Sequence, residues 1–249
     1  MESSAMKDGN FEINAGLDSQ KLAAQFQAVR RIHAANFLAP AAAEVLASSL
    51  RETDYRTFVV TNEEEVATPP GEEGRLSAEE VAEVYDIACE GARNGFASFY
   101  ESDRALSDTA ASSDEAMRTA YERCVEFLGS EAFLSFVRNV TGQEKVSRVE
   151  VRATRFRPGH FLLFHNGTFA ADTTGKRRFV FELNLTPQWR PEWGGMLELR
   201  GREGHDIEGV LPCFNCLDLF EFPRGYWVSQ VTPYAHASRY ALTGAIYAD

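Results

Sequence analysis

The chain of 249 residues has no long hydrophobic run. None of its apolar stretches approaches the ~18 to 20 residues that a membrane-spanning helix needs. The N-terminus, M-E-S-S-A-M-K-D-G-N, lacks the basic segment followed by an apolar one that marks a secretory signal. We therefore expect a cytoplasmic protein with no membrane partner.

Basic charge is also scarce. The sequence has 25 Lys and Arg against 37 Asp and Glu, which gives a formal net charge of −12. Such a chain repels nucleic-acid phosphates unless a local basic surface overcomes the overall field, so we expect no nucleic-acid partner. Many of the acids fall between residues 63 and 83, where we expect a solvated face.

Cysteine is rare, since the chain has only Cys89, Cys124, Cys213 and Cys216. Four dispersed cysteines do not make a disulfide scaffold. Cys213 and Cys216 form a C-x-x-C, but it lies in the apolar stretch P-C-F-N-C-L-D-L-F, with no second pair to complete a zinc site. We expect these two thiols to be core residues.

What the sequence does contain is ordinary globular composition, with 44% hydrophobic and 25% charged residues. We expect a flexible arm at 1–17, which is polar and without period, followed by a single domain at 18–249. Residues 18–148 should be mainly helical support. Residues 149–249 should form a β-barrel core.

Hydrophobic spacing predicts the elements of both halves. Capping boxes at Ser77/Glu80 and Ser112/Glu115 mark two helix starts, and Pro40 and Ser130 mark two more. Residues 95–108 look like an irregular connection. Strands are expected at 31–37, 55–61, 149–156, 161–165, 178–185, 196–200, 206–211, 216–222, 226–232 and 239–247. Helices followed by many strands indicate an α+β fold, with helices buttressing a barrel or jelly roll.

His165 stands where the expected strand 161–165 ends. A histidine at the mouth of a barrel is a candidate metal ligand or acid/base, because neutral imidazole is a common ligand of first-row metals. The alternative is a histidine that is merely partnered in the rim of a sheet.

The order of several short motifs resembles one known family. They are P-G-H-F-L-x-x-H at 158–165, L-N-L-T-P at 183–187, W-G-G-M-L-E-L at 193–199, P-x-F-N at 212–215, V-S-Q-V-T-P-Y at 228–234 and S-R-Y-A-L-T-G at 238–244. Together they are similar to the prolyl-hydroxylase-like branch of the Fe(II)/2-oxoglutarate-dependent oxygenases. The resemblance implies a double-stranded β-helix (jelly-roll barrel), non-heme Fe(II) and 2-oxoglutarate.

The same resemblance implies where the site lies and how it departs from the family. His165 matches the first iron ligand, but Gly167 stands where an Asp is expected, and Tyr226 stands where the distal His is expected. Arg239 matches the arginine that grips the far carboxylate of 2-oxoglutarate. The Gly resembles that of the halogenases of the superfamily, but those enzymes keep both histidines.

Glu182 and Asn184 share a face of their strand, because side chains two apart point the same way. In the family this face looks into the 2-oxoglutarate pocket, so the resemblance implies that Asn184 contacts the co-substrate and that Glu182 lies beside Arg239. A buried acid must find a partner, so we expect Glu182 to pair with Arg239 and block 2-oxoglutarate.

Two functions remain open at this point. One is an oxidoreductase with a rebuilt metal centre of His165, Tyr226 and Glu182, in which Tyr226 and Glu182 are catalytic. It would act on a small amino-acid-like or peptidyl substrate. The other is a non-catalytic oxygenase-fold protein that serves as a binding or interaction module. The sequence indicates no oligomeric state.

Overall fold

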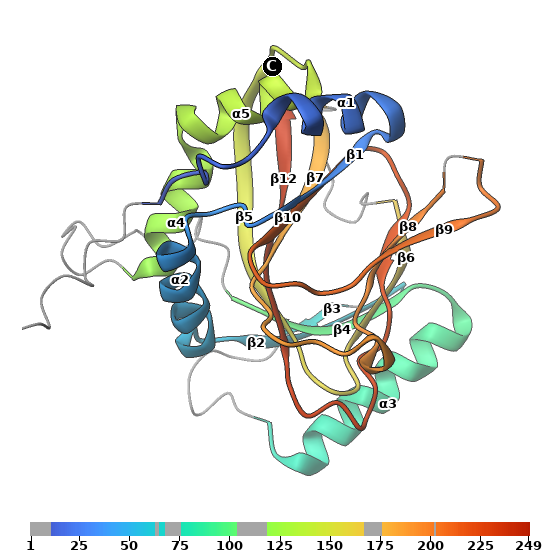
Figure 1. The fold of residues 1–249 in the computed structure, drawn as a ribbon. Coiled ribbons are helices and arrows are strands. Elements are labelled where there is room, and N and C mark those ends of the chain that lie inside the picture. Colours follow the sequence, from blue (N-terminus) through green and yellow to red (C-terminus); the bar gives the residue numbers. More distant parts are fainter. Residues whose placement is uncertain (1–10, 63–64, 68–75, 104–118, 167–175, 202) are drawn as a thin grey trace, which may run out of the picture.

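The computed structural model describes residues 11–62, 65–67, 76–103, 119–166, 176–201 and 203–249. Twelve strands form one sheet that curls into a half-barrel, and every pairing among the described strands is antiparallel. Helices cover the outside of the curled sheet (Figure 1). None of the helices in the described ranges is long and apolar enough to cross a bilayer.

The helices are α1 (Ser19–Val29), α2 (Pro40–Glu52), α3 (Ala78–Asn94), α4 (Ala120–Gly129) and α5 (Glu131–Thr141), with a 3-10 turn η4 (Pro191–Trp193). The first strands are β1 (Arg31–Ala35), β2 (Arg56–Thr61), β3 (Glu65–Ala67) and β4 (Ala97–Ser102). The later strands are β5 (Val146–Phe156), β6 (Phe161–His165), β7 (Arg177–Asn184), β8 (Leu197–Arg200), β9 (Ile207–Val210), β10 (Cys216–Glu221), β11 (Tyr226–Val228) and β12 (Arg239–Ala248).

Local capping explains where the helices begin and end. At α3 the Ser77 hydroxyl accepts from the Glu80 backbone N–H and the Glu80 carboxylate accepts from the Ser77 N–H, as predicted. The same arrangement at Thr119 and Glu122 starts α4, so this helix begins later than the sequence predicted. The predicted capping box at 112–115 lies outside the described residues. Gly142 ends α5 in the left-handed region, with φ of 73°.

The strand order is β1-β10-β7-β12-β5-β4-β6-β11-β8-β9, and β2 joins β4 and β3. All eight strands predicted after residue 148 are present, although the predicted strand 226–232 ends at Val228. The irregular connection predicted at 95–108 is wrong over 97–102, because β4 lies in the sheet between β5 and β6. Its polar Ser98, Glu101 and Ser102 are buried along with Phe99. Burial on both faces removed the alternation that would have revealed the strand.

The N-terminal half is more than helical support, since β1 to β4 belong to the same sheet as the barrel strands. Residues 11–17 are also not a free arm. Phe11 is buried in the main core and Ile13 forms a β-bridge with Leu38. The remainder of the predicted arm, residues 1–10, lies outside the described residues.

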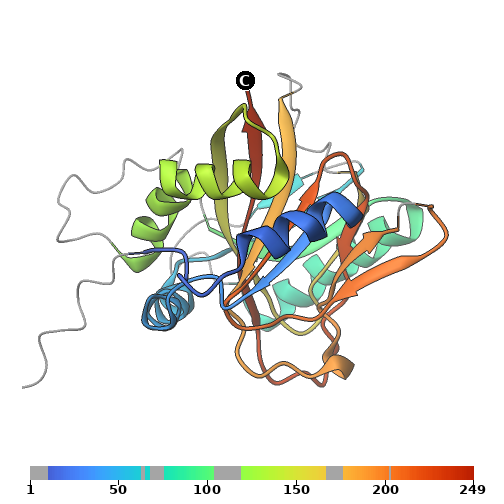
Figure 2. The same ribbon diagram turned by 45° about the horizontal axis from the view of Figure 1, so that its top comes forward.

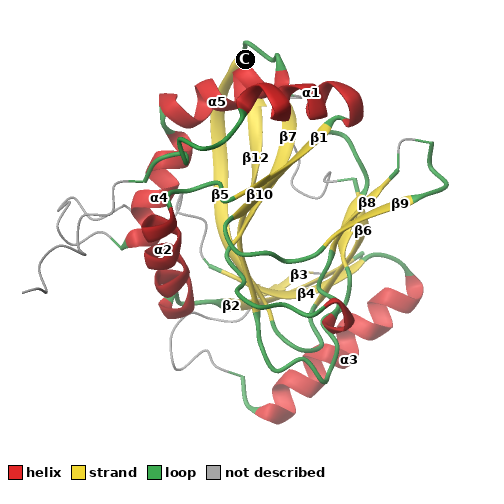
Figure 3. Ribbon diagram, viewed as in Figure 1, coloured by secondary structure: helices red, strands yellow, loops and turns green. Residues whose placement is uncertain are grey.

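Alternation on β7 separates the core from the barrel interior. Phe179, Phe181 and Leu183 pack in the main hydrophobic core against α1, α2, α4 and α5, which lie over one face of the sheet (Figures 2 and 3). Val180 and Glu182 face the opposite way and line the barrel cavity. The helices thus fix the outer face of β7, and the inner face is left for a site.

This arrangement predicts unequal costs for two isoleucines on strands. Ile246 on β12 is 0% exposed in the core, whereas Ile207 on β9 is 63% exposed. Ile246→Ala should lower the free energy of unfolding by about 2–5 kcal/mol, because it leaves a cavity. Ile207→Ala should change it by less than about 0.5 kcal/mol. Urea unfolding followed by circular dichroism measures both, and equal effects would contradict this placement of the core.

Candidate functional site

A cavity of about 620 Å³ lies inside the curled sheet. Most of its wall is aromatic or aliphatic, and a few polar side chains reach it. The aromatic members include Phe96, Tyr100, Phe156, Phe220 and Tyr226, and the polar members include His165, Glu182, Arg152 and Arg177. A mainly apolar cavity with polar groups at a few places is the usual form of a small-molecule site.

His165 ends β6 and lies opposite Tyr226 of β11 in the strand register. The two rings are 4.2 Å apart between centroids, and the imidazole Nδ1 lies 2.9 Å from the Tyr226 carbonyl oxygen. A carbonyl can only accept, so Nδ1 carries a proton. Burial lowers the pKa of His165 to about 4, which keeps the ring neutral near pH 7.

Tyr226 faces the cavity beside His165, as predicted. Its ring also meets Phe220 edge-on at 5.2 Å. Burial raises the pKa of Tyr226 to about 12. The phenol is therefore protonated near neutral pH when no metal is bound.

Glu182 and Arg239 form the predicted buried ion pair, with Glu182 Oε1 2.5 Å from Arg239 Nη2. Glu182 is 6% exposed and Arg239 is 0% exposed. Glu182 lines the cavity, and Arg239 lies behind it with its guanidinium carbon 5.2 Å from the Phe156 ring centre. The cavity wall at this point therefore presents a carboxylate instead of a guanidinium.

The side-chain amide of Asn184 forms hydrogen bonds within the protein, at the end of β7. Its amide oxygen accepts from the Thr186 backbone N–H at 2.9 Å, and its NH₂ donates to Glu182 at 3.3 Å. It is 2% exposed and does not line the cavity. The predicted role of Asn184 in cofactor binding has no support in this geometry, because both ends of the amide already serve the protein.

The three proposed ligands do not fit a metal as they stand. The Glu182 carboxylate is paired with Arg239. No pair of His, Cys, Asp or Glu side chains within the described ranges joins His165 in a cluster tight enough for an ion. Gly167, which stands at the expected second ligand, lies outside those ranges. The described part of the barrel thus does not provide the iron site that the resemblance implies.

The cluster that does come together was missed from the sequence. Cys213 and Cys216 form a disulfide next to His33, so their prediction as plain core thiols is wrong. The C-x-x-C spacing was a usable signal for the two cysteines. No sequence pattern indicated His33, because pairing of β1 with β10 joins segments about 180 residues apart.

Residues 151–246 match the sequence model of the 2OG-Fe(II) oxygenase superfamily. The barrel half of this chain is thus similar in sequence to that superfamily. It is also 30% identical over 96 residues to the prolyl 3-hydroxylase OGFOD1 of Xenopus laevis. That match covers 36% of this chain and only 18% of the Xenopus protein. The prolyl-hydroxylase-like resemblance is therefore confirmed, and the superfamily consists of oxygenase-type oxidoreductases.

Solved structures support the fold over nearly the whole chain. The Pseudomonas putida prolyl-4-hydroxylase matches with a TM-score of 0.59 and 17% identity, over 93% of this chain and 100% of that one. A Trichoplax adhaerens prolyl hydroxylase, solved with a hypoxia inducible factor peptide, matches with a TM-score of 0.59 and 13% identity, over 92% and 89%. The predicted α+β jelly-roll architecture is confirmed.

The buried His160 allows the effect of burial on a histidine pKa to be tested. His160 precedes β6, is 2% exposed and packs 4.4 Å from the Phe99 ring. It does not line the cavity. Burial, with a smaller effect of Arg157, lowers the pKa of His160 to about 3. Between that value and the unfolded pKa near 6.5, the unfolded chain binds a proton that the folded chain does not.

His160 should therefore make stability fall with acid. Its contribution is complete above pH 6.5 and is lost at up to about 1.4 kcal/mol per pH unit as the pH drops toward 3. His160→Phe removes this titration. The free energy of unfolding of the variant should therefore fall by about 2 kcal/mol less than that of wild type between pH 7 and pH 5. Urea unfolding at both pH values measures this. An equal loss in both proteins would show that His160 is not held neutral.

Proposed function

We propose that this chain binds a small amino-acid-like or peptidyl molecule in its barrel cavity and does not use 2-oxoglutarate in the way its relatives do. The observation that carries the proposal is the pair of Glu182 and Arg239. Glu182 Oε1 occupies the place beside Arg239 that a co-substrate carboxylate would need. A second anion there would meet the Glu182 carboxylate at close range in a dry site.

The ligand class follows from the wall of the cavity and from the relatives. A volume of about 620 Å³ suits a small molecule or a short peptide segment. Aromatic side chains line much of it, and aromatic rings bury large apolar area. The Trichoplax protein was solved with a peptide, and the Pseudomonas protein is named a prolyl-4-hydroxylase. Both names support a peptidyl or amino-acid-like ligand here.

Catalysis by a rebuilt centre of His165, Tyr226 and Glu182 is the alternative. It is supported by the close approach of the His165 and Tyr226 rings inside the cavity. Against it, the Glu182 carboxylate is paired with Arg239. We therefore favour the binding function, in which these neutral rings contact the ligand.

The ion pair makes a specific prediction for Glu182→Val. Removing the acid leaves a buried guanidinium without its partner, which should cost on the order of 3–5 kcal/mol of stability. The same change vacates the carboxylate position beside Arg239. 2-Oxoglutarate should then raise the melting temperature of Glu182→Val, because a ligand that binds only the folded state stabilises it. Thermal-shift titration measures both effects.

Wild type and Glu221→Val are the controls for that titration. Glu221 is exposed at the end of β10, so its removal also deletes one acid from a strand but leaves the barrel interior intact. Neither control should respond to 2-oxoglutarate. A large shift in the wild-type protein would show that the co-substrate position is open and would overturn the proposal.

Turnover provides an independent prediction. Wild-type protein supplied with Fe(II), ascorbate, oxygen and 2-oxoglutarate should form no succinate above the rate without protein, because the described barrel residues do not assemble an iron site. Isotope-labelled 2-oxoglutarate and counting of released CO₂ measure this. Release that depends on His165, and is lost in His165→Ala, would establish the catalytic alternative instead.

A further inference from the structure

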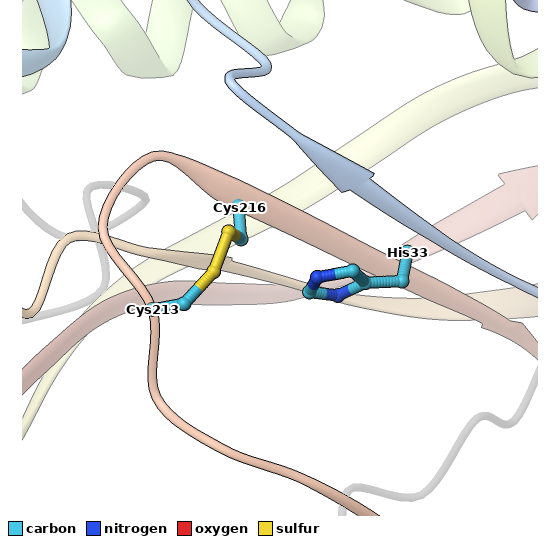
Figure 4. A group of neighbouring side chains, drawn as sticks. All are labelled: His33, Cys213 and Cys216. Atoms are coloured by element: carbon cyan, nitrogen blue, oxygen red, sulfur yellow. A yellow bond between two sulfur atoms is a disulfide. The ribbon is translucent and has the colours of Figure 1, made fainter. Parts of the chain in front are cut away.

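Three side chains outside the barrel cavity form a cluster of soft ligands. His33 lies on β1, Cys216 begins β10, and Cys213 lies in the turn before it. One potential ligand atom from each lies within 4.8 Å of the others. The imidazole edge points toward the two sulfur atoms (Figure 4). Within the described ranges, no other cluster of His, Cys, Asp and Glu side chains is this tight.

We propose that the reduced chain binds a zinc-type divalent ion between the thiolates of Cys213 and Cys216 and the imidazole of His33. Thiolate and imidazole are the ligands that zinc prefers, and the C-x-x-C spacing is common in its sites. Three protein ligands leave a fourth tetrahedral position for water or a small ligand. His33 and Cys213 are each partly exposed, so solvent and metal can reach the site.

The second nitrogen of His33 is already oriented by a carboxylate. His33 and Asp218 lie directly opposite in the β1–β10 register, and Nδ1 lies 3.1 and 3.2 Å from the two carboxylate oxygens. This bond uses Nδ1 and leaves Nε2 for the metal. A carboxylate behind a ligating histidine is a recurring feature of zinc sites, where it fixes the ring and raises its basicity.

The turn that carries the cysteines is held in place by Asn215. The Asn215 amide accepts from the Leu38 N–H and donates to the Leu38 carbonyl, both at 2.8 Å. The Phe37 N–H donates to the Asn215 carbonyl at 2.9 Å. Asn215 is 3% exposed and has φ of 57°, a conformation that Asn tolerates better than most residues. The turn is thus locked to the segment after β1, which positions both sulfur atoms relative to His33.

Charge also favours a cation here. Asp218 is 2% exposed and lies opposite Glu182 in the β7–β10 register, so two buried carboxylates are neighbours. Arg239 pairs with Glu182, and the nearest Arg31 nitrogen is 3.7 Å from Asp218. A divalent ion bound to His33 would add positive charge on the side of Asp218.

The disulfide and the metal-bound form exclude each other. When oxidised glutathione meets the reduced site, the two cysteine sulfurs form one S–S bond and give up two electrons. Glutathione disulfide takes these electrons with two protons and becomes two molecules of glutathione, and the metal is released. The site is therefore a metal site only in the reduced protein.

Zinc and cobalt binding to the full chain tests the proposal. Reduced wild type should take one equivalent of Zn²⁺ in competition with a chromogenic chelator, and Co²⁺ should give a thiolate charge-transfer band. Protein oxidised with glutathione disulfide should show neither. The double variant Cys213→Ser/Cys216→Ser and the single variant His33→Phe should lose the stoichiometric binding. Asp218→Asn should weaken it about 10- to 100-fold.

Cys89→Ser is the matched control, since Cys89 is a free, half-buried thiol on α3. It should keep the full equivalent of zinc and the cobalt band. Circular dichroism establishes that each variant is folded. If reduced wild type binds no more zinc than the double serine variant, the proposal is wrong. Metal that remains in the double serine variant but is lost in His165→Ala would be bound in the barrel cavity. The test therefore distinguishes metal binding in the barrel from metal binding at His33, Cys213 and Cys216.

Discussion

The buried pair of Glu182 and Arg239 is the constraint on which the interior of the barrel depends. Both side chains are buried, so each charge is stabilised by the other. Glu182 is in the middle of β7 and Arg239 begins β12, which are neighbours in the sheet. The pair therefore fixes the inner faces of these two strands relative to each other. It also places a carboxylate, and not the Arg239 guanidinium, in the wall of the cavity.

The inner face of β7, β10 and β1 carries a polar stripe beside the apolar Val180 and Phe220. Strand register places Glu182 opposite Asp218, and Asp218 opposite His33. Cys216 lies opposite Asn184 on the same face. The stripe thus runs from the Arg239 pair to the cysteine cluster across three strands. The Glu182–Arg239 pair and the cluster of His33 with the two cysteines therefore belong to one sheet. They lie apart because of the order of the strands, and not because they belong to different domains.

The fold and half of the site could be predicted because they depend on local rules. Alternation along β7 placed Glu182 on the same face as Asn184, and the family resemblance implied that this face and Arg239 look into the pocket. Their pairing then followed from charge. The strand β4 could not be found, because buried Ser98 and Ser102 look like loop residues in sequence. The cluster of His33 with the cysteines depends on β1 pairing with β10, and nothing local encodes that distant contact.

The wall chemistry indicates which molecules the cavity accepts. Packing of His165 and Tyr226 in a dry aromatic wall lowers the pKa of the imidazole to about 4 and raises that of the phenol to about 12, so both groups are neutral. Neutral groups exchange hydrogen bonds with amides and hydroxyls at little desolvation cost compared with ions. Glu182 disfavours an anion at its own position in the wall. Three arginines, Arg148, Arg152 and Arg177, and a second acid, Glu150, also line the cavity, so its wall offers contacts for ionic as well as neutral groups of a ligand.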